Sequence, residues 1–318
     1  MRDVRDRIAQ LLERGERPAL ATVVATRRSA PRPVGSRLVV SEAGELHGSV
    51  SGGCVESDVA VQAAEVIADG RPRLLTYGIA DDEAWEIGLP CGGEIDVFVQ
   101  RLEREPPDGE GVLVTVLDGD RAGEQELLPR GALEAGVHEL EGRQVFAEAV
   151  GPPPRLVVVG ATDTAEELCR AAGSLGWRTF VIDPRSRLAT KDRLPSAGEI
   201  AVAWPDELEA DADSAVVVLT HEERLDVPAL TAALASDAFY VGAIGSRKTQ
   251  AKRRERLLDA GVPEEALERL SGPAGLDLGA DTPAETAVSI LAEILAMRAG
   301  RDGGRLRERS GPIHAITG

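Results

Sequence analysis

Hydrophobic positions in the second half of the chain come in short continuous runs that alternate with amphipathic stretches. The apolar runs lie at residues 155–160, 178–182, 200–203, 215–220 and 239–244. Such runs are typical of parallel strands that are buried on both faces. Helical segments are expected between them, the first over 164–175. This rhythm predicts an α/β fold in which a Rossmann-like, doubly wound parallel sheet forms the core.

The last helix of this half has a strong start signal. Thr282 can act as its N-cap, Pro283 suits the first helical position, and Glu285 stands three residues after the cap. Together they match a capping box, in which each end of the motif satisfies a backbone N–H of the other. A helix is therefore predicted from this point onward.

The first half of the chain mixes short β-rich runs with amphipathic helical stretches. Strands are predicted at residues 19–24, 37–40, 46–50, 95–99, 112–117 and 144–147. A helix is predicted over 57–68, because Val59, Ala63 and Val66 recur on one side at helical spacing. Residues 1–18 also have the pattern of an amphipathic helix. We expect this half to form a mixed α/β domain.

Two stretches rich in proline and glycine interrupt these patterns. Residues 104–111 indicate a polar loop, and Gly151-Pro152-Pro153-Pro154 indicates a stiff linker. The linker predicts an N-terminal domain over 1–151 and a Rossmann-like domain over 152–300. Residues 301–318 are rich in glycine and locally basic, so they are expected to form a flexible tail.

Composition argues against two classes of partner, nucleic acids and membranes. The 318 residues include 54 acidic and 36 basic ones, a formal net charge of −18. That charge argues against nucleic acid, whose affinity comes largely from cationic contacts to phosphate. No segment approaches the ~20 apolar residues that span a bilayer, and the N-terminal apolar run is too short for a signal peptide. We therefore expect a cytoplasmic protein with no membrane partner.

The three cysteines, Cys54, Cys91 and Cys169, form no CxxC pair. Their low, odd number does not indicate a disulfide framework, and no structural zinc site is expected. Two of them adjoin double glycines, in Gly52-Gly53-Cys54 and Cys91-Gly92-Gly93. Glycines let a ligand approach the backbone closely. A thiol at a helix N-terminus loses its proton more easily, and thiolates suit molybdenum, sulfur transfer or redox chemistry. The alternative is that both are small core residues beside tight turns.

The turn after the first strand of the second domain is where a dinucleotide would bind. Gly160 matches the first glycine of GxGxxG, but Thr162 stands where the second is needed to admit a pyrophosphate. Asp163 would place a carboxylate at the helix N-terminus, where the dipole favours phosphate, unless it only caps the helix. Asp183 ends the second strand, where a ribose-binding acid would sit. These residues favour a Rossmann-like fold but argue against the binding of NAD(P).

Two further strand ends of this sheet carry polar residues. His221 follows the fourth strand, and Gly245-Ser246 follows the fifth and leads into a helix rich in lysine and arginine. Ligands of open α/β sheets bind at the carboxyl ends of the strands. A helix N-terminus with a glycine and a serine offers N–H groups to an anion. This loop is either a phosphate or pterin contact or a plain turn.

These motifs resemble the XdhC/CoxI family of molybdenum hydroxylase accessory proteins, over nearly the whole chain. In the first domain the resemblance rests on residues 21–24, 29–32, 48–56, 77–78, 88–93 and 95–99. In the second it rests on 181–185, 219–221, 240–246, 272–280 and 282–285. The chain departs from the family at Thr162-Asp163, where a Gly-His pair is common.

The resemblance implies a non-catalytic carrier of molybdenum cofactor, or molybdopterin. Such proteins promote replacement of an oxo ligand by sulfur with a cysteine desulfurase. They also help insert the cofactor into a xanthine dehydrogenase-type apoenzyme, while CoxI-type relatives are associated with carbon monoxide dehydrogenase. Carried over, Cys54 and Cys91 become molybdenum-proximal thiols that meet in space around the ligand. The other implied contacts are Gly52, Gly53, Gly92, Gly93, Gly160, Asp183, His221, Gly245 and Ser246. No catalytic residue is expected, and a homodimer is the default assembly.

Two other functions remain open from the residues. An NAD(P)-dependent oxidoreductase would use the Rossmann-like domain, and a thiol redox module would pair Cys54 with Cys91. The two cysteines are far apart in the sequence, so a disulfide would require their Cα atoms to come within about 7 Å.

Overall fold

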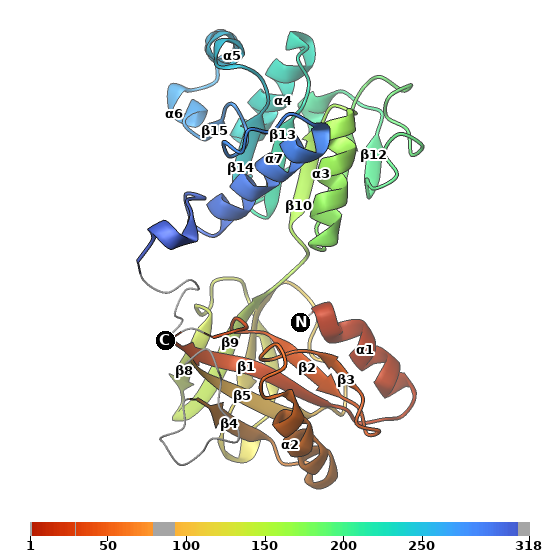
Figure 1. The fold of residues 1–318 in the computed structure, drawn as a ribbon, viewed down its shortest axis with the longest axis vertical. Helices are drawn as coiled ribbons and strands as arrows, with labels where there is room; N and C mark the ends of the chain where they lie inside the picture. The colour runs from red at the N-terminus through yellow and green to blue at the C-terminus, as the bar shows by residue number, and fades with distance from the viewer. Residues whose placement is uncertain (1, 29, 79–92, 311–318) are drawn as a thin grey trace. The chain divides into compact units, whose positions relative to one another are not determined.

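The computed structural model describes residues 2–28, 30–78 and 93–310, which form two compact units (Figure 1). The N-terminal unit extends to Pro152 and the C-terminal unit runs from Pro153 to Arg309. The change from one to the other falls within the proline run that follows Gly151. Each unit has its own hydrophobic core.

The described residues of the N-terminal unit form two antiparallel sheets and two α-helices, α1 (Arg2–Glu13) and α2 (Glu56–Asp69). The five-stranded sheet has the order β3-β2-β1-β5-β4. Its strands are β1 (Ala19–Arg27), β2 (Arg37–Val40), β3 (Leu46–Gly48), β4 (Arg73–Tyr77) and β5 (Glu94–Arg101). The four-stranded sheet has the order β7-β6-β9-β8. Its strands are β6 (Gly111–Val116), β7 (Gln125–Leu128), β8 (Gly136–Leu140) and β9 (Arg143–Val150).

Both faces of the five-stranded sheet are covered, since successive side chains point to opposite faces and pack into apolar clusters on each. Ala21, Val97 and Val99 face α2 and pack against its buried side, which includes Val59 and Ala63. On the opposite face, Leu20, Val39 and Leu102 pack against Val4, Ile8 and Leu11 of α1. Val24 and Phe98 on that face meet Leu117 and Phe146 of the four-stranded sheet. The sequence of this sheet therefore shows nearly continuous apolar runs.

The C-terminal unit is a six-stranded parallel sheet in the order β12-β11-β10-β13-β14-β15. The strands are β10 (Arg155–Val159), β11 (Arg178–Ile182), β12 (Glu199–Ala201), β13 (Ser214–Val218), β14 (Tyr240–Ala243) and β15 (Leu270–Ser271). This order reverses between β10 and β13, as in Rossmann folds, and the switch point is where such sheets bind ligands. The predicted Rossmann-like doubly wound sheet is confirmed.

Helices lie on both faces of this sheet (Figure 1). On one face α3 (Asp163–Ser174) and α7 (Pro283–Arg298) lie side by side over Leu156 and Val158. On the other, α4 (Glu223–Ala235), α5 (Arg247–Asp259) and α6 (Glu264–Leu267) cover Val157 and Val159. α7 begins with the predicted capping box, since both of its hydrogen bonds form. No helix in the described ranges is long and apolar enough to cross a membrane.

The strands predicted from apolar runs are present, and the part of the chain that the structure describes contains four further short strands that were not predicted. These are β4, β7, β8 and β15. β4 alternates between half-buried and exposed residues until Tyr77, and β8 is exposed over most of its length. Strands at a sheet edge keep their shape through backbone pairing with a neighbour, which leaves little trace in the local sequence.

Candidate functional site

Cys54 lies on the loop that joins β3 to α2, one residue before the helix N-cap Val55. Its side chain is exposed. The preceding Gly52 and Gly53 have φ angles of +76° and +110°, a region that side chains with a Cβ rarely adopt. A Cβ at either glycine would meet no heavy atom within 4 Å. The backbone beside the thiol is therefore open to a ligand.

The carboxylate of Glu56, the first residue of α2, holds this loop in shape. It accepts hydrogen bonds from the backbone N–H groups of Val50 at 3.1 Å, Ser51 at 2.9 Å and Gly53 at 2.8 Å. The hydroxyl of Ser49 donates to it at 2.6 Å, and so does the hydroxyl of Ser51. One partly buried anion therefore organises the whole turn before Cys54.

The same hydrogen bonds keep the Glu56 carboxylate ionised. Burial by itself would raise its pKa, but the bonds from the Ser49 and Ser51 hydroxyls and from the backbone lower the pKa to about 2. Ser51 in turn accepts from the backbone N–H groups of Cys54 and Val55, each at 2.9 Å. The loop is thus rigid at the position of the thiol.

The residues that flank the segment with the second predicted cysteine lie at the same end of the sheet as this loop. Tyr77, the last residue of β4, donates a hydrogen bond of 2.7 Å to Asp58 in the first turn of α2. Gly78 follows it, and Glu94 begins the neighbouring strand, with Tyr77 paired to Ile95. Gly93, which precedes Glu94, is buried. Cys91 and Gly92 lie outside the described residues.

Charged groups also gather at this end of the sheet. Asp96 on β5 accepts from the hydroxyl of Thr76 at 2.8 Å and from the guanidinium of Arg27 at 2.8 Å. Arg27 also pairs with Glu94. Burial, reinforced by the bond to Asp58, raises the pKa of Tyr77, so the phenol stays protonated. These pairs tie together the ends of β1, β4 and β5.

The third cysteine belongs to the core. Cys169 on α3 is fully buried among apolar side chains. Burial raises the pKa of its thiol to about 11, so it remains protonated at neutral pH. Within the described ranges no three His, Cys, Asp or Glu side chains are placed to hold a metal ion together.

In the C-terminal unit, protein side chains fill the space around the turn that follows β10. Gly160 has φ +108°, and a Cβ there would come within 2.6 Å of Thr220 Cγ2. The hydroxyl of Thr162 accepts a hydrogen bond of 3.2 Å from the backbone N–H of Ala165, so the N-cap of α3 is Thr162. Asp163 is exposed and pairs with an arginine of a neighbouring loop at 3.4 Å.

Asp183 is fully buried and its carboxylate is fully engaged. It accepts from the N–H of Ala161 at 2.8 Å and from the guanidinium of Arg185 at 2.6 Å and 2.9 Å. Burial opposes ionisation, but these bonds lower the pKa of Asp183. Arg185 also pairs with Glu222, which follows β13, at 2.8 Å. Because β10 lies between β11 and β13, Arg185 spans the switch point of the sheet.

The loop after β14 is supported by a buried ion pair. Oδ2 of Asp226 on α4 and Nη2 of Arg253 on α5 lie 2.7 Å apart, and both side chains are nearly inaccessible to solvent. Arg253 donates to the carbonyl of Ile244 at 3.0 Å, just before Gly245. Ser246 caps α5 by accepting from an N–H at 3.2 Å. The predicted strand-end residues of this unit therefore share one edge, where His221 is exposed.

The predicted residues form two groups, one in each unit. Cys54 and its glycines belong to the first, and Gly160, Asp183, His221, Gly245 and Ser246 belong to the second. The sequence interpretation missed Glu56, Arg185 and Glu222 as site residues. Arg185 stands in the motif at 181–185, which was available as a signal. Glu56 likewise ends the motif at 48–56, and Glu222 directly follows His221, but neither position reveals which groups its carboxylate contacts.

Two family models match the chain. The XdhC and CoxI family matches residues 11–78, and the XdhC Rossmann domain matches residues 156–294. The two matches together cover more than half of the chain, and each falls within one unit of the structure.

Individual proteins resemble the chain along most of its length. The molybdenum cofactor insertion chaperone PaoD of Escherichia coli is 29% identical over 91% of this chain and 86% of its own. A protein of Bacillus subtilis named as a probable xanthine dehydrogenase subunit is 27% identical over 91% and 95%. A crystal structure of a xanthine dehydrogenase from Bacillus halodurans has the same fold, with a TM-score of 0.74, 24% identity and coverage of 95% and 97%.

Proposed function

The chain belongs to the XdhC/CoxI family, and from this premise we propose that it binds molybdenum cofactor and serves the maturation of a molybdenum hydroxylase. The client is an apoenzyme of the xanthine dehydrogenase or carbon monoxide dehydrogenase type. In this proposal the chain acts as a carrier and chaperone and not as a catalyst. The similarity to a molybdenum cofactor insertion chaperone supports it.

The observation that carries the proposal is the exposed Cys54 thiol on a rigid, open loop. A soft sulfur donor suits molybdenum, and the two glycines before it leave the backbone accessible. The Glu56 bonds hold this loop without help from a ligand, so little ordering entropy is lost on binding. Cys91 is the proposed second thiol, because the residues that flank its segment lie at the same end of the sheet.

We propose that the C-terminal unit has a ligand-binding edge of its own at the strand ends. His221, Gly245 and Ser246 lie at the edge where doubly wound sheets bind ligands. Arg185 supplies a cation at the switch point, and the buried Asp183 holds its guanidinium in place. In this scheme Asp183 positions Arg185 and does not touch the ligand itself, while Gly160 allows the close packing of the turn.

Cofactor loading of cysteine variants tests the proposal. The full chain is produced in a host that makes molybdopterin, and bound pterin is measured by the fluorescence of its oxidised form. We expect wild type to carry stoichiometric pterin and Cys54→Ala and Cys91→Ala to lose most of it. Cys169→Ala is the matched control, because that thiol is sealed in the core. Full pterin in both variants would disprove the thiol role.

Sulfuration is the finer part of the proposal. A cysteine desulfurase would supply sulfur as an enzyme persulfide. With two electrons from an added thiol reductant and two protons, that sulfur would replace one oxo ligand of the bound cofactor, which would leave as water. The measurement is cyanide-labile sulfur on the pterin-loaded protein after incubation with a desulfurase, cysteine and dithiothreitol. Loading without any gain in labile sulfur would leave insertion as the function and remove sulfuration from it.

We further propose that the chain forms a homodimer through α7. One side of this helix packs into the core through Ile290 and Ile294. The other side carries Val288 and Leu295, which are 54% and 39% exposed. A helix that is apolar on two sides usually has two partners. Val288→Glu is expected to halve the mass measured by light scattering, and an unchanged mass would contradict the assignment to α7.

A further inference from the structure

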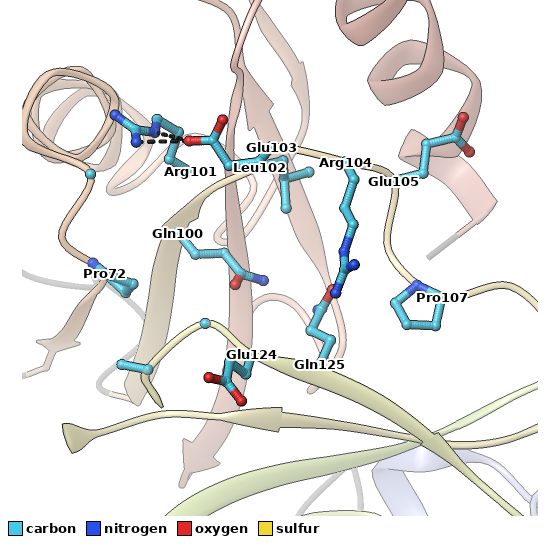
Figure 2. A pocket seen from close by; sticks show the side chains of 13 residues that line it. Pro72, Gln100, Arg101, Leu102, Glu103, Arg104, Glu105, Pro107, Glu124 and Gln125 are labelled. Carbon is cyan, nitrogen blue, oxygen red and sulfur yellow. Dashed lines mark hydrogen bonds and ion pairs between the residues drawn. The ribbon is translucent and has the colours of Figure 1, made fainter. Parts of the chain in front are cut away.

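A cavity of about 350 Å³ lies in the N-terminal unit, where β5 ends (Figure 2). Its walls come from the end of β5 and the loop after it, from the turn at 122–125 before β7, and from residues 70 and 72 ahead of β4. A volume of this size accommodates a small organic molecule. Among the described residues, none of those predicted as site residues lines it.

The cavity contains a buried amide without a protein partner. Gln100 is only 3% exposed, and its side chain makes no hydrogen bond to any residue in the described ranges. Strand alternation places it on the same face as Phe98 and Leu102, which are apolar. Figure 2 shows its amide directed into the cavity. The little of this side chain that stays exposed faces the cavity, so a ligand bound there can take the place of water as the hydrogen-bond partner of the amide.

Glycine keeps the space in front of this amide open. Gly123 has φ +88°, and a Cβ there would lie 3.0 Å from Gln100 Oε1 and 3.2 Å from Pro72 Cγ. Any larger residue would press on the amide and close the cavity at this point. The turn at 122–125 therefore needs glycine both for its backbone conformation and for the room it leaves.

Three carboxylates and two guanidiniums line the cavity, and of these groups only Arg104 lacks a charged partner among the described residues. Glu105 lies 3.8 Å from the guanidinium of Arg5, which is outside the lining. Arg101 pairs with Glu103 at 2.7 Å, and Glu124 accepts from Arg121 at 2.6 Å. Arg104 extends from the loop after β5 toward the cavity (Figure 2). It forms no ion pair or hydrogen bond with the described part of the chain. Its guanidinium is thus available to an anion, which it can hold through two parallel hydrogen bonds.

We propose that this cavity binds a small organic anion that has an amide-like edge. Gln100 offers both a donor and an acceptor, which matches the N–H and C=O pair of a planar heterocycle. Arg104 pairs with the carboxylate or phosphate of the same molecule. Gln125 donates to Thr115 at 3.1 Å, an arrangement that leaves its carbonyl oxygen as a further acceptor at the wall.

This site is separate from the proposed thiol site. β5 begins at Glu94, beside the Cys54 loop, and ends at Arg101, beside the cavity. A strand of eight residues spans roughly 25 Å. A ligand in the cavity therefore does not touch Cys54, and either proposal can fail without the other.

Calorimetry on the full-length protein tests the cavity with two probes, orotate and pterin-6-carboxylate. Each has an amide-like edge and a carboxylate. Uracil keeps the edge without the charge, and benzoate keeps the charge without the edge. We expect saturable binding of at least one probe, and binding at least tenfold weaker for uracil and benzoate.

The variants Gln100→Leu and Arg104→Gln are each expected to weaken the bound probe at least tenfold. Arg14→Gln, an exposed arginine on the same unit, is the matched control and should bind like wild type. Cys54→Ala should also bind like wild type. Because the Gln100 amide has no protein partner in the described ranges, Gln100→Leu should unfold at the wild-type temperature or above it.

Absence of saturable binding for both probes would overturn the proposal. Affinity that is unchanged in Gln100→Leu and Arg104→Gln would overturn it as well, because the probe would then bind elsewhere. If Gln100→Leu unfolds at a lower temperature, Arg104→Gln decides the outcome, since its side chain is exposed and its loss leaves the core intact.

Discussion

The carboxylate of Glu56 offers the most direct test of how the thiol loop is built. Five donors converge on it, namely three backbone N–H groups and the hydroxyls of Ser49 and Ser51. In Glu56→Gln one acceptor oxygen becomes an NH2 group that faces donors. We expect the loop to lose its shape and the N-terminal unit to lose stability.

The size of this loss follows from the pKa of Glu56, which hydrogen bonds lower from 4.5 to about 2 against the effect of burial. At 1.36 kcal/mol per pKa unit the shift corresponds to at most about 3–4 kcal/mol. Glu56 is partly exposed, so solvent screening reduces this to about 1–2 kcal/mol. A lowered pKa in the folded state means that the stabilisation is complete above the unfolded value and is lost as pH falls from about 4.5 toward about 2.

Unfolding by urea is the assay, with wild type, Glu56→Gln and the control Glu139→Gln compared at several pH values between 3.5 and 7. Glu139 is an exposed residue of β8. At pH 7 we expect Glu56→Gln to be less stable than wild type by about 1–2 kcal/mol, and the gap should narrow at pH 3.5. A gap that stays constant over this range would refute the reasoning.

Three further predictions rest on buried groups. Arg253→Met should lower the free energy of unfolding of the C-terminal unit in urea by about 3–5 kcal/mol, because it leaves Asp226 charged and buried. Adding Asp226→Asn to this variant should restore part of the lost stability. If Arg253→Met alone costs less than about 1 kcal/mol, the pairing is contradicted. Iodoacetamide should label Cys54 quickly and Cys169 only after unfolding, because Cys169 is sealed and burial raises its pKa to about 11. Mass spectrometry of the labelled peptides checks this, and rapid labelling of folded Cys169 would contradict it. NADH should bind weakly or not at all in calorimetry, because protein donors already hydrogen-bond the Asp183 carboxylate. Micromolar affinity for NADH would favour the oxidoreductase alternative.

Features that depend on residues close together in the sequence were predictable from the sequence alone. The strands β10 and β13 are buried on both faces, so each leaves a continuous apolar run. The capping box at Thr282 and Glu285 joins residues three positions apart. The glycines before Cys54 needed no partner to be recognised, since positive φ is a local property. Edge strands such as β4 were missed because pairing, and not pattern, gives them their shape.

Contacts between distant segments were decided only by the tertiary structure. The order of the strands brings Arg185 to Glu222 across the switch point, 37 positions apart in the chain. The packing of two sheets turns Gln100 and Gly123 toward one cavity, although neither belongs to a motif. The physical reason is that residue type and periodicity report the environment of each residue within its own element. Which elements meet depends on the free energy of packing the whole unit, and that information is spread over the chain.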